Sequence, residues 1–105
     1  MRPKQNPSPM SSFELVDEGD GRFAVRGAMS FATANALLRK SENLFARHQS
    51  LAIDLSGVDK TDSAGLALIV EWKSQAASRN AAISIEGVPE TLVAIAKTSE
   101  VEDLI

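Results

Sequence analysis

The side chains that could carry chemistry lie close together in the middle of the sequence. Asp54, Asp59, Asp62 and Ser63 offer three carboxylates and a hydroxyl, which could bind Mg²⁺ or hold a phosphate. Carboxylates of this kind are more typical of loops and helix caps. The chain has no cysteine and no tyrosine, and its only histidine, His48, is expected to be exposed at the end of another helix. Since nothing in the pattern brings Ser63 and His48 together, we predict no catalytic residue, no metal site and no cofactor.

These residues surround the junction of a predicted strand and a predicted helix. Residues 51–55 form a short apolar run, the pattern of a buried strand that ends at Ser56 and Gly57. A polar loop over 59–61 follows, and the apolar run over 66–70 then begins a long helix. The loop and the start of this helix therefore position the candidate residues.

Three polar residues directly precede this helix. Thr61, Asp62 and Ser63 each carry an oxygen that can accept a hydrogen bond from the first free N–H groups of the helix. The Ser63 hydroxyl lies at the positive end of the helix dipole, where a phosphate could be held or a partner could bind. Gly65 lies in the first helical turn. It either allows close backbone packing or leaves the start of the helix uncovered for a partner, and the pattern leaves both interpretations open.

The run DSAGLAL at residues 62–68, preceded by IDLSGV at 53–58, resembles the signature of STAS domains. This is the family of anti-sigma-factor antagonists and related modules. Within it, the run is most similar to the small STAS subunits of Mla phospholipid-transport ATP-binding cassette (ABC) complexes. The resemblance in element order covers residues 13–105, which we expect to form one STAS domain, and its specific part covers 53–69.

The resemblance implies one of two functions. The first is a non-catalytic cytoplasmic subunit that binds the nucleotide-binding (ATPase) subunit of an ABC phospholipid transporter and regulates or stabilises it, in support of outer-membrane lipid asymmetry. The second is an anti-sigma factor antagonist, in which an anti-sigma factor kinase would phosphorylate Ser63. The antagonists more often have a second serine or threonine where Ala64 stands, which favours the first function.

Composition limits the partners. The chain has 105 residues, enough for one domain, and its 11 basic and 14 acidic residues give a net charge of −3. There is no basic excess to attract nucleic acid or anionic lipid. Apolar runs such as Leu66–Val70 are too short to insert in a membrane, and we expect no secretory signal at the N-terminus. The absence of cysteine suits the cytoplasm, so we expect any location at the inner membrane to depend on a partner.

The first part of the chain predicts a tail, a hairpin and a helix. Residues 1–12 contain three prolines and little to bury, and are expected to be a flexible tail. Two stretches of alternating apolar residues, 13–17 and 22–26, flank an acidic, glycine-containing turn and predict a β-hairpin. A helix is then expected from about Phe31, with Ser30 as its cap.

The last part predicts a strand over 81–86 and a helix with Pro89 in its first turn. Val101, Leu104 and Ile105 have the spacing of a packed C-terminus. The order β-β-α-β-α-β-α predicts an α/β fold with a mixed four-stranded sheet, and the STAS resemblance implies that the helices lie largely on one side. The predicted core consists of Leu37, Leu38, Ile53, Leu55, Leu66, Ile69, Val70, Ile83 and Ile85.

The long helix predicts a surface for a partner. On a helical wheel, the inward face is expected to contain Leu66, Ile69, Val70, Lys73, Ala76 and Ala77. Leu68 falls on the opposite side, and Trp72 falls between the two faces. Trp72 is either a core anchor or part of an exposed docking strip, and both remain open. The predicted partner-binding strip is Ser63, Ala64, Ala67, Leu68 and Trp72. The predicted supporting loop is Asp59, Thr61, Asp62 and Gly65.

Overall fold

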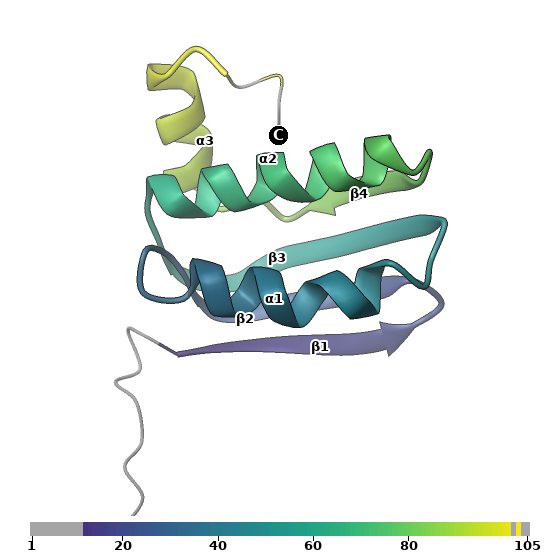
Figure 1. Ribbon diagram of the computed structural model, residues 1–105. Coiled ribbons are helices and arrows are strands. Elements are labelled where there is room, and N and C mark those ends of the chain that lie inside the picture. Colours follow the sequence, from purple (N-terminus) through teal and green to yellow (C-terminus); the bar gives the residue numbers. More distant parts are fainter. Residues whose placement is uncertain (1–11, 102, 104–105) are drawn as a thin grey trace, which may run out of the picture.

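Seven elements follow one another in the predicted order (Figure 1). The computed structural model describes residues 12–101 and 103. The elements are β1 (Phe13–Gly19), β2 (Arg22–Met29), α1 (Ala34–Phe45), β3 (Ser50–Thr61), α2 (Ser63–Ser78), β4 (Ala82–Glu86) and α3 (Glu90–Thr98). The expectations for residues 1–11, Leu104 and Ile105 lie outside the described residues.

The four strands pair in the order β1-β2-β3-β4, with β1 antiparallel to β2 and the later pairs parallel. The hairpin turns at Asp20 and Gly21, whose φ angles are 56° and 81°. A type I′ turn requires two positive φ angles, and an Asp-Gly pair adopts them readily. The predicted mixed sheet and its opening hairpin are confirmed.

Strand β3 is longer than the sequence predicts, because it continues through Gly57 to Thr61. Its pairing with β2 shifts register twice near the end of β2, and such bulges let a strand bend and continue. A Cβ at Gly57 would lie 3.3 Å from the Val25 carbonyl oxygen and 2.8 Å from Arg26 Cγ, so glycine lets β2 lie close. The prediction of a loop at 59–61 is therefore wrong, since these residues end β3 and lead directly into α2.

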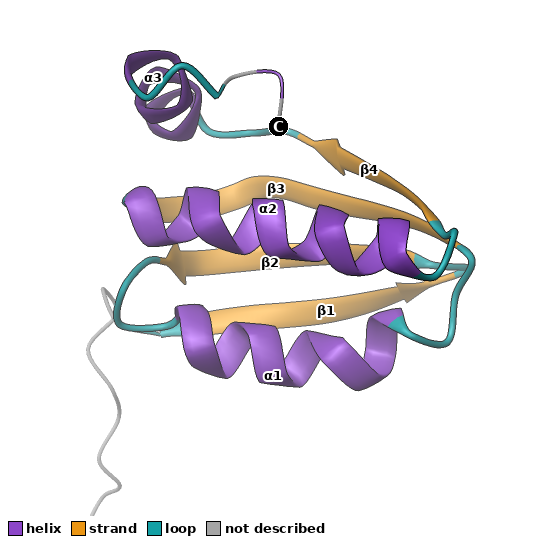
Figure 2. Ribbon diagram, turned by 45° about the horizontal axis from the view of Figure 1, so that its top comes forward, coloured by secondary structure: helices purple, strands orange, loops and turns teal. Residues whose placement is uncertain are grey.

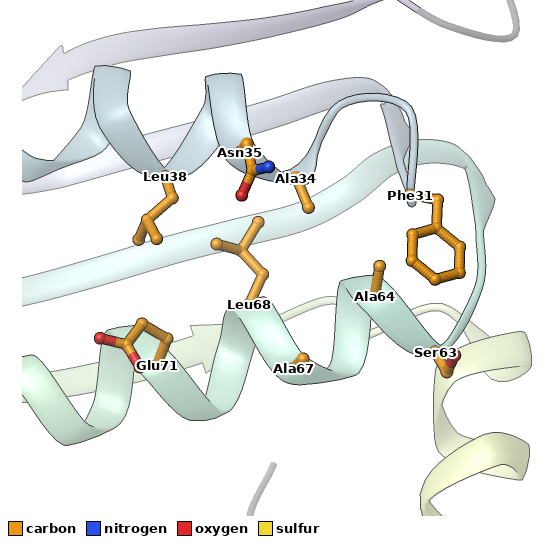
Figure 3. Close-up of a pocket in the computed structure, with 9 residues that line it drawn as sticks. All are labelled: Phe31, Ala34, Asn35, Leu38, Ser63, Ala64, Ala67, Leu68 and Glu71. Atoms are coloured by element: carbon orange, nitrogen blue, oxygen red, sulfur yellow. The ribbon is translucent and has the colours of Figure 1, made fainter.

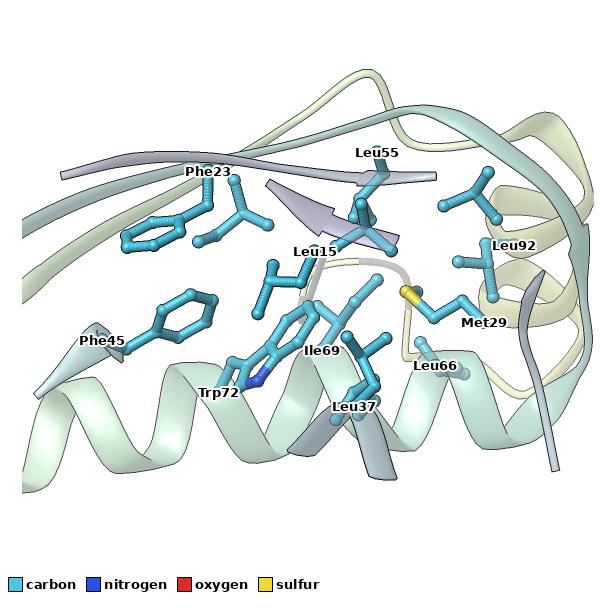
Figure 4. Packing of buried hydrophobic residues seen from close by; sticks show 14 of the residues in the cluster. Leu15, Phe23, Met29, Leu37, Phe45, Leu55, Leu66, Ile69, Trp72 and Leu92 are labelled. Atoms are coloured by element: carbon cyan, nitrogen blue, oxygen red, sulfur yellow. The ribbon is translucent and has the colours of Figure 1, made fainter. Parts of the chain in front are cut away.

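Helices α1 and α2 lie side by side on one face of the sheet, and α3 packs against α2 (Figure 2). The inward side chains of the strands and helices meet in one hydrophobic core (Figure 4). The predicted core residues that are buried are Leu37, Ile53, Leu55, Leu66 and Ile69. Those that are half-buried are Leu38, Val70, Ile83 and Ile85.

Trp72 lies inside this core and is only 1% exposed. Its ring centroid is 5.4 Å from that of Phe45, which is in turn 4.9 Å from that of Phe23. The indole Nε1–H donates to Ser41 Oγ at 2.9 Å, and the Ser41 hydroxyl donates to the Leu38 carbonyl at 2.8 Å. These bonds satisfy the polar atoms that Trp72 and Ser41 bury. Trp72 therefore anchors the core, and the prediction that it belongs to the partner-binding strip is wrong.

Helix α1 begins at Ala34, later than the predicted start at Phe31. Ser30 is not its cap, because Ser30 is buried and its N–H donates to Thr33 Oγ1 at 3.0 Å. The Thr33 hydroxyl donates to the Ala28 carbonyl at 2.9 Å. These bonds hold the connection from β2 in a turn, so that Phe31 lies outside the helix.

The last predicted strand and helix are confirmed as β4 and α3. Pro89 stands at the N-cap, and Glu90 in the first turn places a negative charge at the positive end of the helix dipole. Leu92 and Ala96 are buried, and Val101 packs against the core after the helix ends. Helix α3 therefore anchors to α2 through one apolar side.

Candidate functional site

The buried face of helix α2 is rotated from the predicted one, although Leu66, Ile69 and Ala76 are buried as predicted. Its buried residues are Gly65, Leu66, Leu68, Ile69, Trp72 and Ala76. Leu68 is only 4% exposed, so the prediction that Leu68 points to solvent is wrong. Ala77, predicted to face inward, is exposed. Because apolar residues surround most of this helix, its sequence lacks a polar face that would fix its orientation.

A groove of about 500 Å³ runs between α1 and the first half of α2 (Figure 3). Its lining residues are Phe31, Ala34, Asn35, Leu38, Ser63, Ala64, Ala67, Leu68 and Glu71. Ser63 and Ala67 are exposed, Ala64 is half-buried, and Leu68 forms part of the floor. The structure thus brings together every residue of the predicted strip except Trp72.

Phe31 stands at one end of this groove and was missed as a site residue. Its side chain is 81% exposed, and it is the only large hydrophobic residue exposed in the described part of the chain. In Figure 3 its ring lies close to Ala64 and Ser63 at the beginning of α2. No local signal favoured Thr33 over Ser30 as the N-cap of α1, since both residue types are typical of that position and Thr33 makes no side-chain cap hydrogen bond.

Asp62 links the two sides of the groove at this end. Its Oδ1 accepts a hydrogen bond from the Ala64 N–H at 2.9 Å and thereby caps α2. Its Oδ2 accepts from the Phe31 N–H at 3.1 Å. One carboxylate therefore fixes both the start of α2 and the turn that carries Phe31.

Thr61 and Gly65 hold β2 and α2 together beneath this link. The Thr61 hydroxyl donates to the Met29 carbonyl at 2.8 Å. A Cβ at Gly65 would meet the Thr61 hydroxyl and would lie 2.6 Å from the Met29 carbonyl oxygen. Gly65 is thus required for close packing, which settles the alternatives left open for it. Asp59 is exposed on β3 and does not line the groove.

Ser63 is the first residue of α2, and its side chain is exposed. Asp62 provides the cap, and within residues 12–101 and 103 the Ser63 hydroxyl makes no hydrogen bond. The hydroxyl lies at the positive end of a long helix, so it can donate to a partner or carry a phosphate.

The other groups considered for chemistry lie away from the groove. His48 follows the far end of α1, half-buried rather than exposed, with its ring edge toward Phe23 at 5.8 Å between centroids. Asp54 lies on the uncovered face of the sheet, where the Ser56 N–H donates to it at 2.9 Å and lowers its pKa. In the described part of the chain, no three acidic or histidine side chains converge as a metal site would require.

None of the described helices is both long enough and apolar enough to cross a bilayer.

One comparison with known proteins identifies the family, and another shows which solved structures share the fold. A family model described as "Mlab, STAS domain" matches residues 16–105, and no curated protein matches the sequence. A solved anti-sigma factor antagonist from Mycobacterium paratuberculosis has a TM-score of 0.63 and 19% identity, over 89% of this chain and 82% of that one. The anti-sigma factor antagonist SpoIIAA in its unphosphorylated form gives a TM-score of 0.64 and 11% identity, over 89% and 84%.

Identities this low show a shared fold alone. The family model, in contrast, spans the described core together with the junction that carries Asp62 and Ser63. It confirms the resemblance that residues 62–68 carry in the sequence. The chain belongs to the STAS domain family.

Proposed function

We propose that this chain is the non-catalytic STAS subunit of an Mla-type ABC phospholipid transporter, and that it binds the nucleotide-binding subunit through the groove between α1 and α2. The observation that carries the proposal is the exposed ring of Phe31 at the end of an apolar groove, beside the unbonded hydroxyl of Ser63. The Mlab description of the matching family model supports the choice of partner. The protein would then be cytoplasmic and held at the inner membrane by that partner.

The groove has the composition of an interface centre. Protein interfaces are enriched in aromatic residues and depleted of charge at their core, and a few anchor residues dominate their affinity. Here Phe31, Ala64 and Ala67 provide apolar surface, and Glu71 is the only charged residue among the described ones that line the groove. Asp62 holds the backbone of Phe31, which lowers the entropy lost on binding.

The exposure of Ser63 favours a second candidate function, that of an anti-sigma factor antagonist switched by phosphorylation. Its hydroxyl is open to a kinase and lies at a helix start that would favour a phosphate. Ala64, where the antagonists more often have serine or threonine, favours the transporter subunit. Transfer of phosphate from ATP to Ser63 by an anti-sigma factor kinase, absent in Ser63→Ala, would support the second function.

The test of the transporter function uses two matched variants of α2. Ala67 and Ala77 are both exposed, but only Ala67 lines the groove. We expect Ala67→Asp to weaken the complex with the nucleotide-binding subunit by about 2 kcal/mol or more, since it places a charge in a desolvated contact. Ala77→Asp should leave the complex intact.

The measurement is co-purification with the nucleotide-binding subunit of the same organism, followed by titration of the purified pair. Melting curves should show that both isolated variants remain folded, with losses of about 1 kcal/mol or less, because both sites are exposed and only helix propensity and the helix dipole oppose the change. If Ala67→Asp binds the ATPase subunit as tightly as Ala77→Asp does, the groove is not the interface. If the wild-type chain does not bind the ATPase subunit at all, the proposed function is wrong.

A further inference from the structure

The walls of the groove offer side chains and almost no free backbone. Beyond their first turns, helices α1 and α2 satisfy their N–H and C=O groups internally. In those first turns, the Ala34 N–H donates to the Ser30 carbonyl, and the Ala64 and Gly65 N–H groups donate to Asp62. Within the part of the chain that the structure describes, the lining residues with polar side chains are Asn35, Ser63 and Glu71. An extended peptide in this groove would leave most of its backbone groups without partners, whereas a helix brings its own hydrogen bonds. The shape and chemistry of the groove therefore favour a helix.

Small residues on both walls allow a helix to approach closely. Ala34 on α1 faces Ala64 and Ala67 on α2 across the groove (Figure 3). Helices pack about 8–10 Å apart, and small side chains at the contact allow the shorter distances. The floor is formed by Leu38 and Leu68, which point toward each other. From Ser63 to Glu71 the groove follows about two turns of α2, or roughly 12 Å at 1.5 Å per residue.

The end of the groove away from Phe31 carries one acidic side chain, and a second lines the adjoining depression. Glu71 lines the groove there and accepts a hydrogen bond from Gln75 Nε2 at 3.1 Å. Gln75 and Glu42 together line the adjoining depression between α1 and α2. Glu42 and Glu71 are both exposed, and neither forms an ion pair with any other described residue. Arg79 also lines this depression, but its guanidinium is bonded to the Phe45 carbonyl at 2.7 Å.

We propose that the segment of the nucleotide-binding subunit that fills this groove is an amphipathic helix of about two turns with a basic residue at one end. Its apolar side covers Ala64, Ala67 and Leu68, and its lysine or arginine faces Glu71 and Glu42. The Phe31 ring packs over the other end. This inference rests on the proposed function and adds to it the structure and charge of the docking segment.

The first experiment maps the docking segment by photo-crosslinking in the full-length pair. Asn35 and Ala36 are neighbours on α1 and both are exposed, but only Asn35 lines the groove. With p-benzoylphenylalanine at position 35, we expect a crosslink to a helical peptide of the ATPase subunit. That peptide should have apolar residues at i, i+3 or i+4, and i+7, with a lysine or arginine within one turn. The same probe at position 36 should give at least fivefold less of this product.

The second experiment exchanges the charges. We expect Glu42→Lys combined with Glu71→Lys to raise the dissociation constant at least tenfold. Exchanging the basic residue of the crosslinked helix for glutamate should recover most of that loss. Glu18→Lys combined with Glu100→Lys reverses two exposed charges that do not line the groove, makes the same change in net charge, and should change the dissociation constant less than twofold.

The outcomes distinguish a failure of this inference from a failure of the proposed function. If the ATPase subunit binds but the crosslink falls on a strand, a loop or a second copy of this chain, the inference is overturned and the proposed function stands. The same holds if the complex forms without any crosslink from position 35, or if the charge exchange recovers nothing. If the ATPase subunit does not bind the wild-type chain, the proposed function fails and the inference fails with it.

Discussion

At the residue scale, the Asp62 carboxylate controls the geometry of the open end of the groove. It accepts one hydrogen bond from Ala64 and one from Phe31, which lie on segments far apart in the sequence. The sequence offered Thr61, Asp62 and Ser63 as possible caps for α2, and the cap could be predicted because it is local. The bond to Phe31 could not be predicted, because it depends on how β2 and β3 end beside each other.

Removing this carboxylate should destabilise the protein and loosen Phe31. We expect Asp62→Ala to lower the free energy of unfolding by about 1–3 kcal/mol, since a helix cap and a second hydrogen bond are lost. Asp62→Asn should lose less, because one amide oxygen can still cap α2 while the NH₂ group cannot accept from Phe31. Urea titration of the three proteins measures the difference. Equal midpoints for Asp62→Ala and the wild type would contradict this role.

Phe31 should matter for binding and not for stability. Because its side chain is 81% exposed, Phe31→Ala should change the free energy of unfolding by less than about 0.5 kcal/mol. The same change should weaken the complex with the ATPase subunit by about 2 kcal/mol or more, as loss of an aromatic anchor does. Phe31→Leu, which keeps apolar bulk, should lose less. Titration calorimetry of the complex, together with melting curves of the free variants, tests both parts. An unchanged affinity would remove Phe31 from the interface.

At the element scale, helix α2 shows where sequence reasoning reached its limit. Its existence, its start and its attachment to β3 followed from capping residues and apolar runs. Its orientation did not, because leucine, isoleucine, valine and alanine occur on most of its sides. Packing against the sheet selected Leu68 and Trp72 as inward residues, and the wheel alone could not select them. The extent of β3 was missed for a related reason, since Ser56 and Gly57 are turn residues locally but fit a bulged strand.

The corrected orientation makes a clear stability prediction. Leu68 and Ile69 are both buried, so replacing either with alanine should cost about 2–5 kcal/mol. The sequence alone predicts this effect for Ile69, as a core residue, and not for Leu68. Chemical denaturation of Leu68→Ala, with Ala67→Ser as an exposed neighbour for control, measures the difference. A cost below about 0.5 kcal/mol for Leu68→Ala would restore the orientation predicted from the sequence.

At the scale of the whole molecule, the two faces of the sheet differ. One face is covered by α1 and α2, and the other carries polar side chains, including two ion pairs, Arg22–Glu86 at 3.1 Å and Arg26–Glu14 at 3.6 Å. Asp54 lies among them, and hydrogen bonds from Ser56, followed by the charges of Arg22 and Arg26, lower its pKa. The alternation of apolar and charged positions along 22–26 is consistent with this division. For β3 the sequence predicted only a buried strand, and the placement of the helices on one side was implied by the STAS resemblance.

Ionisation of Asp54 should make the free energy of unfolding depend on pH in the acid range. Its folded pKa lies below the ordinary value of 3.8, so the ionised form stabilises the folded state. This contribution is fully present above about pH 4 and is lost as the pH falls through the folded pKa. We therefore expect Asp54→Asn to be less stable than the wild type at pH 7, with the difference shrinking toward pH 2–3. Urea titrations across this range measure it. A difference that does not change with pH would contradict the assigned cause.

The order of the strands in the sheet is also their order in the chain. Each strand pairs with the one made just before it, so no strand has to insert between two that are already paired. During synthesis, at about 5–20 residues per second, β3 can add to a finished hairpin, and β4 to a finished three-stranded sheet. The nascent chain therefore exposes one growing edge of the sheet at a time, and the Phe31 turn is made before the aspartate that will hold it.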